Sequence, residues 1–124
     1  MAEYIPGVCN IGPAEIANRR KIGITWTIIS IVIGALLFFF DAPSWSRLII
    51  FLPATIAFSG LYQAKFHFCA GYGMSGLYNV AKSLGKSDSV EQAEFRKKDK
   101  AKAQQIFGLS LISAATIAVL FYFI

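Results

Sequence analysis

Three long segments without a charged residue constrain this chain more than any other feature of its sequence. They cover residues 24–40, 48–62 and 106–124. A helix that crosses the ~30 Å hydrocarbon core of a bilayer needs about 20 mainly apolar residues, so each segment is typical of a transmembrane helix. The second is short and must extend into its flanks, and Pro53 is expected to kink it in mid-span. The sequence therefore predicts one all-α integral membrane domain, residues 1–124, with three transmembrane helices.

The placement of the basic residues predicts the orientation of these helices. All of the 12 Lys and Arg except Arg47 lie before the first segment or between the second and the third. Arg47 is expected to pair with Asp41 in a short outer turn. By the positive-inside rule, the N-terminus lies inside and the C-terminus outside. The net charge of +5 then indicates contact with lipid, and argues against nucleic acid as a partner. We expect a multi-pass protein of the plasma membrane, such as the bacterial inner membrane, without a cleavable signal peptide.

Local signals place the ends of the helices. Gly12 suits an N-cap and Pro13 the first helical position, so the first helix should run from there to Phe40. Residues 77–84 carry an apolar helical stripe and are interpreted as a short interfacial helix. Two overlapping capping-box patterns then predict a helix that starts near Ser89 and runs to the C-terminus, with a basic cytoplasmic extension before its membrane part.

Cys9, His67 and Cys69 form the sharpest chemical candidate, because two thiols and an imidazole suit zinc or copper. A fourth ligand is missing and there is no Cys-x-x-Cys spacing, so we predict no metal and no cofactor other than bound lipid. A redox-active or sulfur-carrying Cys69 is the chemical alternative to plain packing. Residues 71–76 fit G-x-G-x-x-G, but a transmembrane helix precedes them instead of a strand, which argues against a dinucleotide site.

Small residues at helical spacing predict close helix contacts. Ser110, Ala114 and Ala118 share one face of the third helix, and Ser30 and Gly34 share one face of the first. Such faces let backbones approach closely, either within this chain or against another subunit. The cores of the spans hold no ionisable residue, which argues against transport of protons, ions or charged solutes.

Two stretches resemble the YgaP-like transmembrane domain family. The entry to its first helix matches Asn10, Gly12, Glu15, Arg19 and Gly23, and the exit from its second matches Phe68, Cys69, Tyr72 and Gly76. The chain departs from the pattern at Glu15 (Asp in the family), Ile16 (Arg) and Ala70 (Pro). The resemblance implies a two-helix membrane hairpin of unknown function, found alone or fused to a rhodanese domain that handles persulfide sulfur.

The resemblance divides the chain into a hairpin module at 9–80, a basic cytoplasmic connection at 81–104 and a third span at 105–124. Within the module, Glu15 and Arg19 should meet at i,i+4, with Arg19 near the headgroups or the Tyr72 loop. Asn10 and Tyr72 should tie the N-terminal turn to the exit of the second span.

We interpret the chain as a non-catalytic accessory subunit that packs on a larger membrane complex or on copies of itself. One alternative is a thiol-dependent sulfur or redox partner that uses Cys69 and Cys9. Another is an oligomeric conduit for lipid or a small solute.

Overall fold

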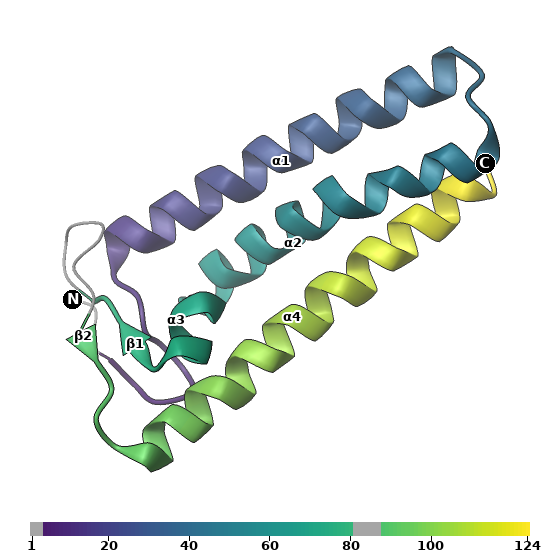
Figure 1. The fold of residues 1–124 in the computed structure, drawn as a ribbon. Helices are drawn as coiled ribbons and strands as arrows, with labels where there is room; N and C mark the ends of the chain where they lie inside the picture. The colour runs from purple at the N-terminus through teal and green to yellow at the C-terminus, as the bar shows by residue number, and fades with distance from the viewer. Residues whose placement is uncertain (1–3, 81–87) are drawn as a thin grey trace.

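The computed structural model describes residues 4–80 and 88–124. Of the described residues 75% are helical, and the three long helices lie side by side with α2 between α1 and α4 (Figure 1). Their bounds are α1 Pro13–Phe39, α2 Phe51–Phe66 and α4 Ala93–Tyr122, and a 3₁₀ helix, η1 Ser44–Ile50, leads into α2. All three are long and apolar enough to cross a membrane, with η1 and α2 counted as one helix. The predicted three-helix architecture is therefore confirmed.

The start of α1 agrees with its sequence signals. Gly12 is the extended N-cap and Pro13 the first helical residue, where a missing backbone N–H costs nothing. The helix ends at Phe39, one residue before the predicted end. Asp41 follows in the left-handed region, at φ 52°, and the chain turns back into η1.

The sequence predicts a kink of the second span at Pro53, and the helix changes from 3₁₀ to α just before it. Pro53 is the third residue of α2, just after the 3₁₀ helix ends. In the first turn of an α-helix the backbone N–H has no intrahelical acceptor, so proline there breaks no bond. The short apolar segment gains its length from η1, and the apolar helix spans 23 residues.

Two glycines allow α1 and α2 to touch through their backbones. A Cβ placed on Gly60 would lie 2.7 Å from the backbone nitrogen of Gly23 and 2.9 Å from the carbonyl oxygen of Arg19. A Cβ on Gly23 would lie 2.8 Å from the backbone nitrogen of Leu61. Real Cβ contacts are never this short, so any side chain at either position would push the helices apart.

The small face of α4 is buried within the chain. Ser110, Ala114 and Ala118 are almost fully covered, in line with Ala103 and Ile106. This face packs on α2 and η1, and a hydrogen bond of 2.7 Å between Tyr62 and Ser113 joins α2 to α4 nearby. The small residues of α4 therefore make a contact inside the molecule.

The connection between α2 and α4 differs from the prediction. It contains a short helix, α3 Ala70–Ser75, and two paired strands, β1 Leu77–Tyr78 and β2 Asp88–Ser89, in antiparallel register. The interfacial helix is wrong over 77–80, and its remainder at 81–84 lies outside the described residues. The chain is thus not strictly all-α.

The predicted start of the last helix near Ser89 is also wrong. Ser89 pairs with Leu77 in the small sheet, and α4 begins at Ala93 after Gln92, without a side-chain cap. The capping boxes fail because strand pairing holds Asp88 and Ser89 in extended conformation. Beyond Ala93 nothing interrupts the helix until the C-terminal end, as predicted.

Candidate functional site

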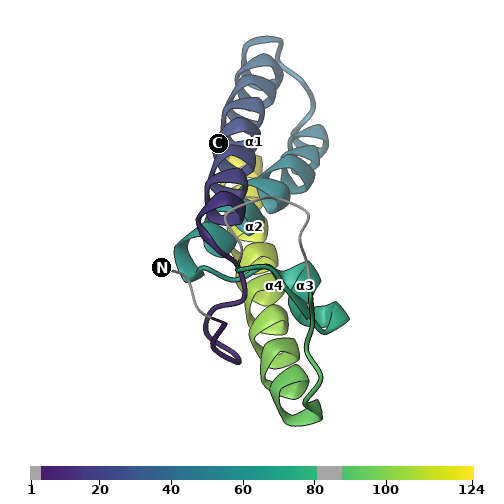
Figure 2. The ribbon, with the colours of Figure 1, turned by 90° about the vertical axis from the view of Figure 1, so that its left-hand side faces the viewer.

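The polar residues gather at one end of the bundle, in a structure that we call the cap: residues 4–12, 67–80 and 88–92, including α3. Figure 2 shows α3 beside the first half of α4, with the N-terminal segment crossing the same end of the bundle. The opposite end, which holds the turn at residues 40–43 and the C-terminus, we call the hairpin end (Figure 1).

Asn10 is the central residue of the cap and is fully buried. Its Oδ1 accepts a hydrogen bond of 2.6 Å from the backbone N–H of Cys69, and its Nδ2 donates to the carbonyl of Cys69 at 3.1 Å. Its own N–H donates to the carbonyl of His67, and its carbonyl accepts from the N–H of Asn79. One residue thus joins the N-terminal segment to both ends of α3, and the tie predicted for Asn10 is present.

A partly buried ion pair lies beside Asn10. Arg19 Nη2 contacts Glu15 Oε2 at 3.2 Å and Cys69 Sγ at 3.1 Å, and Glu15 Oε1 accepts from Asn79 Nδ2 at 3.4 Å. The predicted pairing of Glu15 with Arg19 is confirmed. Arg19 therefore reaches the segment that holds Tyr72, one of its two expected placements, through the thiol of Cys69.

Tyr72 borders this network. Its pKa is raised above the ordinary value, first by burial and then by the negative charge of Glu15. Burial disfavours the phenolate, and a nearby carboxylate disfavours it further. Tyr72 therefore stays a neutral hydroxyl close to the Glu15–Arg19 pair.

The other motif residues have packing roles. Gly23 makes the contact with α2, and Phe68 is fully buried in a cluster with Ala70, Ala103 and Ile106. Gly76 ends α3 with φ 73°, in the left-handed region that suits glycine. The residues of the family pattern therefore lie together at the cap and at the adjacent α1–α2 contact.

Asp99 is a second buried centre, which sequence reasoning missed. It lies on α4 with no exposed surface; Tyr4 donates to its Oδ2 at 2.6 Å and the N–H of Gly7 to its Oδ1 at 2.7 Å. Burial and this carboxylate raise the pKa of Tyr4. The sequence placed Asp99 in a solvated basic extension. The available signal was its position on the helical face of Ala103 and Ile106.

The three metal candidates are not brought together. Cys9 Sγ donates to the carbonyl of Ile11, His67 is exposed and ends α2 in left-handed conformation, and Cys69 is buried beside Arg19. Across residues 4–80 and 88–124, no group of three or more His, Cys, Asp or Glu side chains has the geometry to hold a metal ion.

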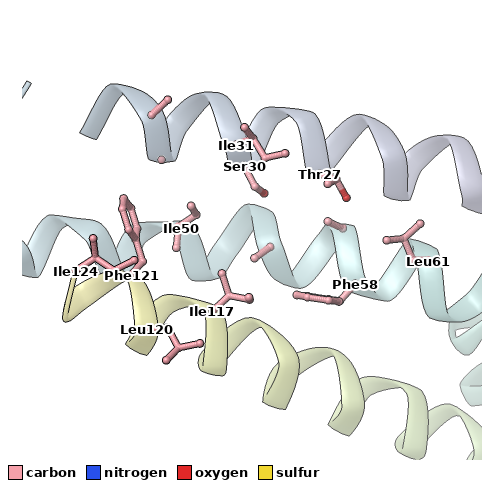
Figure 3. Close-up of a pocket in the computed structure, with 14 residues that line it drawn as sticks. Thr27, Ser30, Ile31, Ile50, Phe58, Leu61, Ile117, Leu120, Phe121 and Ile124 are labelled. Carbon is pink, nitrogen blue, oxygen red and sulfur yellow. The ribbon is translucent and has the colours of Figure 1, made fainter. Parts of the chain in front are cut away.

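A groove of about 490 Å³ opens between α1 and α4 toward the hairpin end, with α2 as its floor (Figure 3). Its lining is almost wholly apolar and includes Ser30, Gly34 and Ala35 of α1, Ala54 and Ala57 of α2, and Ile117 and Phe121 of α4. The hydroxyl of Ser30 donates to the carbonyl of Trp26 in its own helix. The small face predicted on α1 therefore borders an open groove.

Arg47 holds the hairpin end together beside this groove. Its Nη1 donates to the carbonyl of Phe121 at 3.4 Å, and its guanidinium lies 5.8 Å from the ring centre of Phe38 and 5.4 Å from that of Phe121. The expected pairing with Asp41 is wrong, because the one ion pair in the described part of the chain is Glu15–Arg19. Arg47 instead binds the last turn of α4, where the helix dipole favours a cation.

No family model, curated protein or solved structure matches this chain. The likeness to the YgaP-like domain thus stays a prediction based on the motif residues.

Proposed function

We propose that this chain is a non-catalytic multi-pass membrane protein, with the cap on the cytoplasmic side of a bacterial inner membrane, that serves as an accessory subunit. It packs on a transmembrane helix of a larger assembly through the groove between α1 and α4. The placement of basic residues supports the orientation. A membrane-impermeant thiol label that reached a cysteine at position 98 from outside would contradict it.

The groove is the observation that carries the proposal. Its walls hold small residues, which allow a partner backbone to approach closely, and helix association in lipid depends on such packing. The Ser30 hydroxyl already donates a hydrogen bond within α1, so a partner in the groove does not need a polar group to pair with it. An apolar helix with its own backbone bonds satisfied therefore suits it.

The hydrogen bonding of the cap supports a structural role. The side chain of Asn10 bonds to the backbone of Cys69, and that of Glu15 to Arg19 and Asn79. These groups stabilise the irregular backbone that joins α2 to α4. A catalytic role would need reactive groups turned toward a substrate.

A matched pair of substitutions tests the groove. Ala35 and Ala115 are both exposed helical alanines, but Ala35 lines the groove and Ala115 does not. Ala35→Phe should fill the groove and remove the partner from complexes extracted in mild detergent, whereas Ala115→Phe should leave complex size unchanged. The readout is native mass spectrometry of the tagged protein. Equal complexes from both variants would overturn the proposal.

The contact between Arg19 and Cys69 favours a second candidate, a sulfur-carrying thiol. A neighbouring cation is one of the features shared by reactive cysteines. In this function the Cys69 thiolate attacks the outer sulfur of a persulfide donor, and the donor leaves as a thiolate. Intact mass should then rise by one sulfur atom on incubation with glutathione persulfide, in wild type and Cys9→Ala but not in Cys69→Ala. An unchanged wild-type mass would exclude this candidate.

A further inference from the structure

A second hollow, of about 450 Å³, lies on the cap side between the end of α3 and the first turns of α4. Its polar lining contrasts with the groove at the hairpin end. Arg96, Lys97 and Lys100 of α4 line it, together with Ser75 and Gly76 at the end of α3. Three cations therefore border one hollow.

These cations have no anionic partner among the residues that the structure describes. No acidic residue lines the hollow, and in the described parts of the chain no carboxylate pairs with Arg96, Lys97 or Lys100. Among the described residues, Arg96 donates to the carbonyl of Glu91, at 3.2 Å. Lys100 lies four residues after Arg96 and three after Lys97, spacings at which like charges on a helix repel. An anion held between them would relieve this repulsion.

Neutral groups around the hollow add to its preference for anions. Ala93, the first residue of α4, lines it, and α4 has no side-chain cap. The first N–H groups of such a helix lack intrahelical acceptors, and this end of the helix dipole is positive. The hydroxyl of Ser75 lines the hollow as well, without a partner among the residues that the structure describes.

The depth of the hollow fits a lipid phosphate. The apolar segment of α4 begins at Ile106, and at ~1.5 Å per residue Lys100 and Arg96 lie roughly 9 Å and 15 Å beyond it along the helix axis. Headgroups occupy the zone next to the hydrocarbon core, and the long side chain of Lys100 can reach it. Nearby, the Lys102 ammonium lies 4.3 Å from the ring centre of Phe66, an arrangement typical of the membrane interface.

From these observations we propose that the hollow between α3 and α4 binds a phosphate group, carried either by an anionic phospholipid headgroup or by a soluble phosphoester. The site rests on the membrane placement proposed above, but it does not depend on the groove or on a partner helix. Arg96, Lys97 and Lys100 supply charge, and Ser75 supplies a neutral donor. Basic pockets between helices on the cytoplasmic side recognise lipid headgroups in this way.

The test is native mass spectrometry of purified protein in detergent, titrated with phosphatidylglycerol or with phosphatidylcholine of the same acyl chains. The site variant is Lys97→Gln with Lys100→Gln. The control is Arg20→Gln with Lys21→Gln, which removes equal charge from exposed positions on α1. Each cation contributes on the order of fivefold, so the site variant should bind phosphatidylglycerol about 30-fold more weakly, with phosphatidylcholine unchanged.

Further arms of the same experiment identify the source of the phosphate. Competition by millimolar inorganic phosphate would support a soluble phosphoester, and its absence would support a lipid. The variant Lys97→Arg with Lys100→Arg keeps both positive charges, so it should bind phosphatidylglycerol like wild type and unlike the glutamine variant. Equal affinity for both lipids, or an equal loss in the control, would overturn the site. Ala35→Phe changes the groove and not the hollow, so it should bind lipid like wild type. Lipid binding therefore tests the phosphate site independently of the groove proposal.

Discussion

The cap and the helical bundle are stabilised by different means. In the bundle, α1 and α2 meet through Gly23 and Gly60, where only hydrogen atoms fit between the backbones. In the cap, the side chain of Asn10 accepts from and donates to the backbone of Cys69, and the backbone N–H of Gly7 donates to Asp99 of α4, both across long sequence separations. A helix forms the hydrogen bonds of its backbone internally, so helices pack when their surfaces have complementary shapes. An irregular segment leaves backbone N–H and C=O groups that need specific hydrogen-bond partners.

This difference predicts which substitutions each region tolerates. The bundle should tolerate substitutions of polar by apolar residues. Added volume at a contact between helices should destabilise it. The cap should also be sensitive to the loss of single polar atoms, because each such loss leaves a buried group unpaired.

The largest effect is expected at the α1–α2 contact. Gly60→Ala would place a Cβ 2.7 Å from the backbone nitrogen of Gly23, and since backbone cannot move aside, we expect about 3 kcal/mol or more of destabilisation. Gly108→Ala is the control, because a Cβ there has no neighbour within 4 Å, and it should be neutral or mildly stabilising. Thermal unfolding in detergent measures both. Similar melting temperatures would show that volume does not limit the bundle.

An intermediate effect is expected at the centre of the cap. Asn10→Ala would leave the buried N–H and C=O of Cys69 without their side-chain partners, at a cost of about 2–3 kcal/mol. Amide hydrogen exchange should rise in residues 67–79 but not in the middle of α1. Asn18→Ala, which removes an amide without a described hydrogen bond, should change neither. Uniform exchange across the helices would mean that cap and bundle unfold as one unit.

The smallest effect is expected at Tyr4, on the edge of the cap. Tyr4→Phe removes the hydrogen bond to Asp99, at a cost of about 1–2 kcal/mol. Because folding raises the pKa of Tyr4, its contribution is present below the ordinary tyrosine pKa of ~10 and is lost as pH rises above it. A pH series from 8 to 11 should therefore show a steeper loss of stability in wild type than in Tyr4→Phe. Parallel curves would exclude Tyr4 as the source.

The parts of the fold that local physics determines could be predicted from the sequence. The start of α1 follows from Gly12 and Pro13, and the three apolar helices follow from length and hydropathy. The Glu15–Arg19 pair follows from helical spacing, and Asn10 was located through the motif that surrounds it. Each of these signals lies within one segment or at one of its ends.

The rest depends on contacts between distant segments. His67 adopts a left-handed conformation and β1 pairs with β2, although the apolar stripe over 77–84 favours a helix. Asp99 shares the helical face of the buried residues Ala103 and Ile106, but the N-terminal segment that covers it is distant in sequence, and no pattern near residue 99 identifies that partner. The hollow beside Lys97 and Lys100 likewise forms only when α3 packs on α4.

The hydrogen bond between Tyr4 and Asp99 joins residues 95 positions apart, and this has a consequence for biosynthesis. The segment that contains Tyr4 leaves the ribosome 95 residues before its acceptor Asp99. Such long-range contacts form late, because the intervening chain must be ordered first. We therefore expect the α1–α2 hairpin to insert while the first residues are still unpaired, and the arrival of α4 to be the event that closes the molecule.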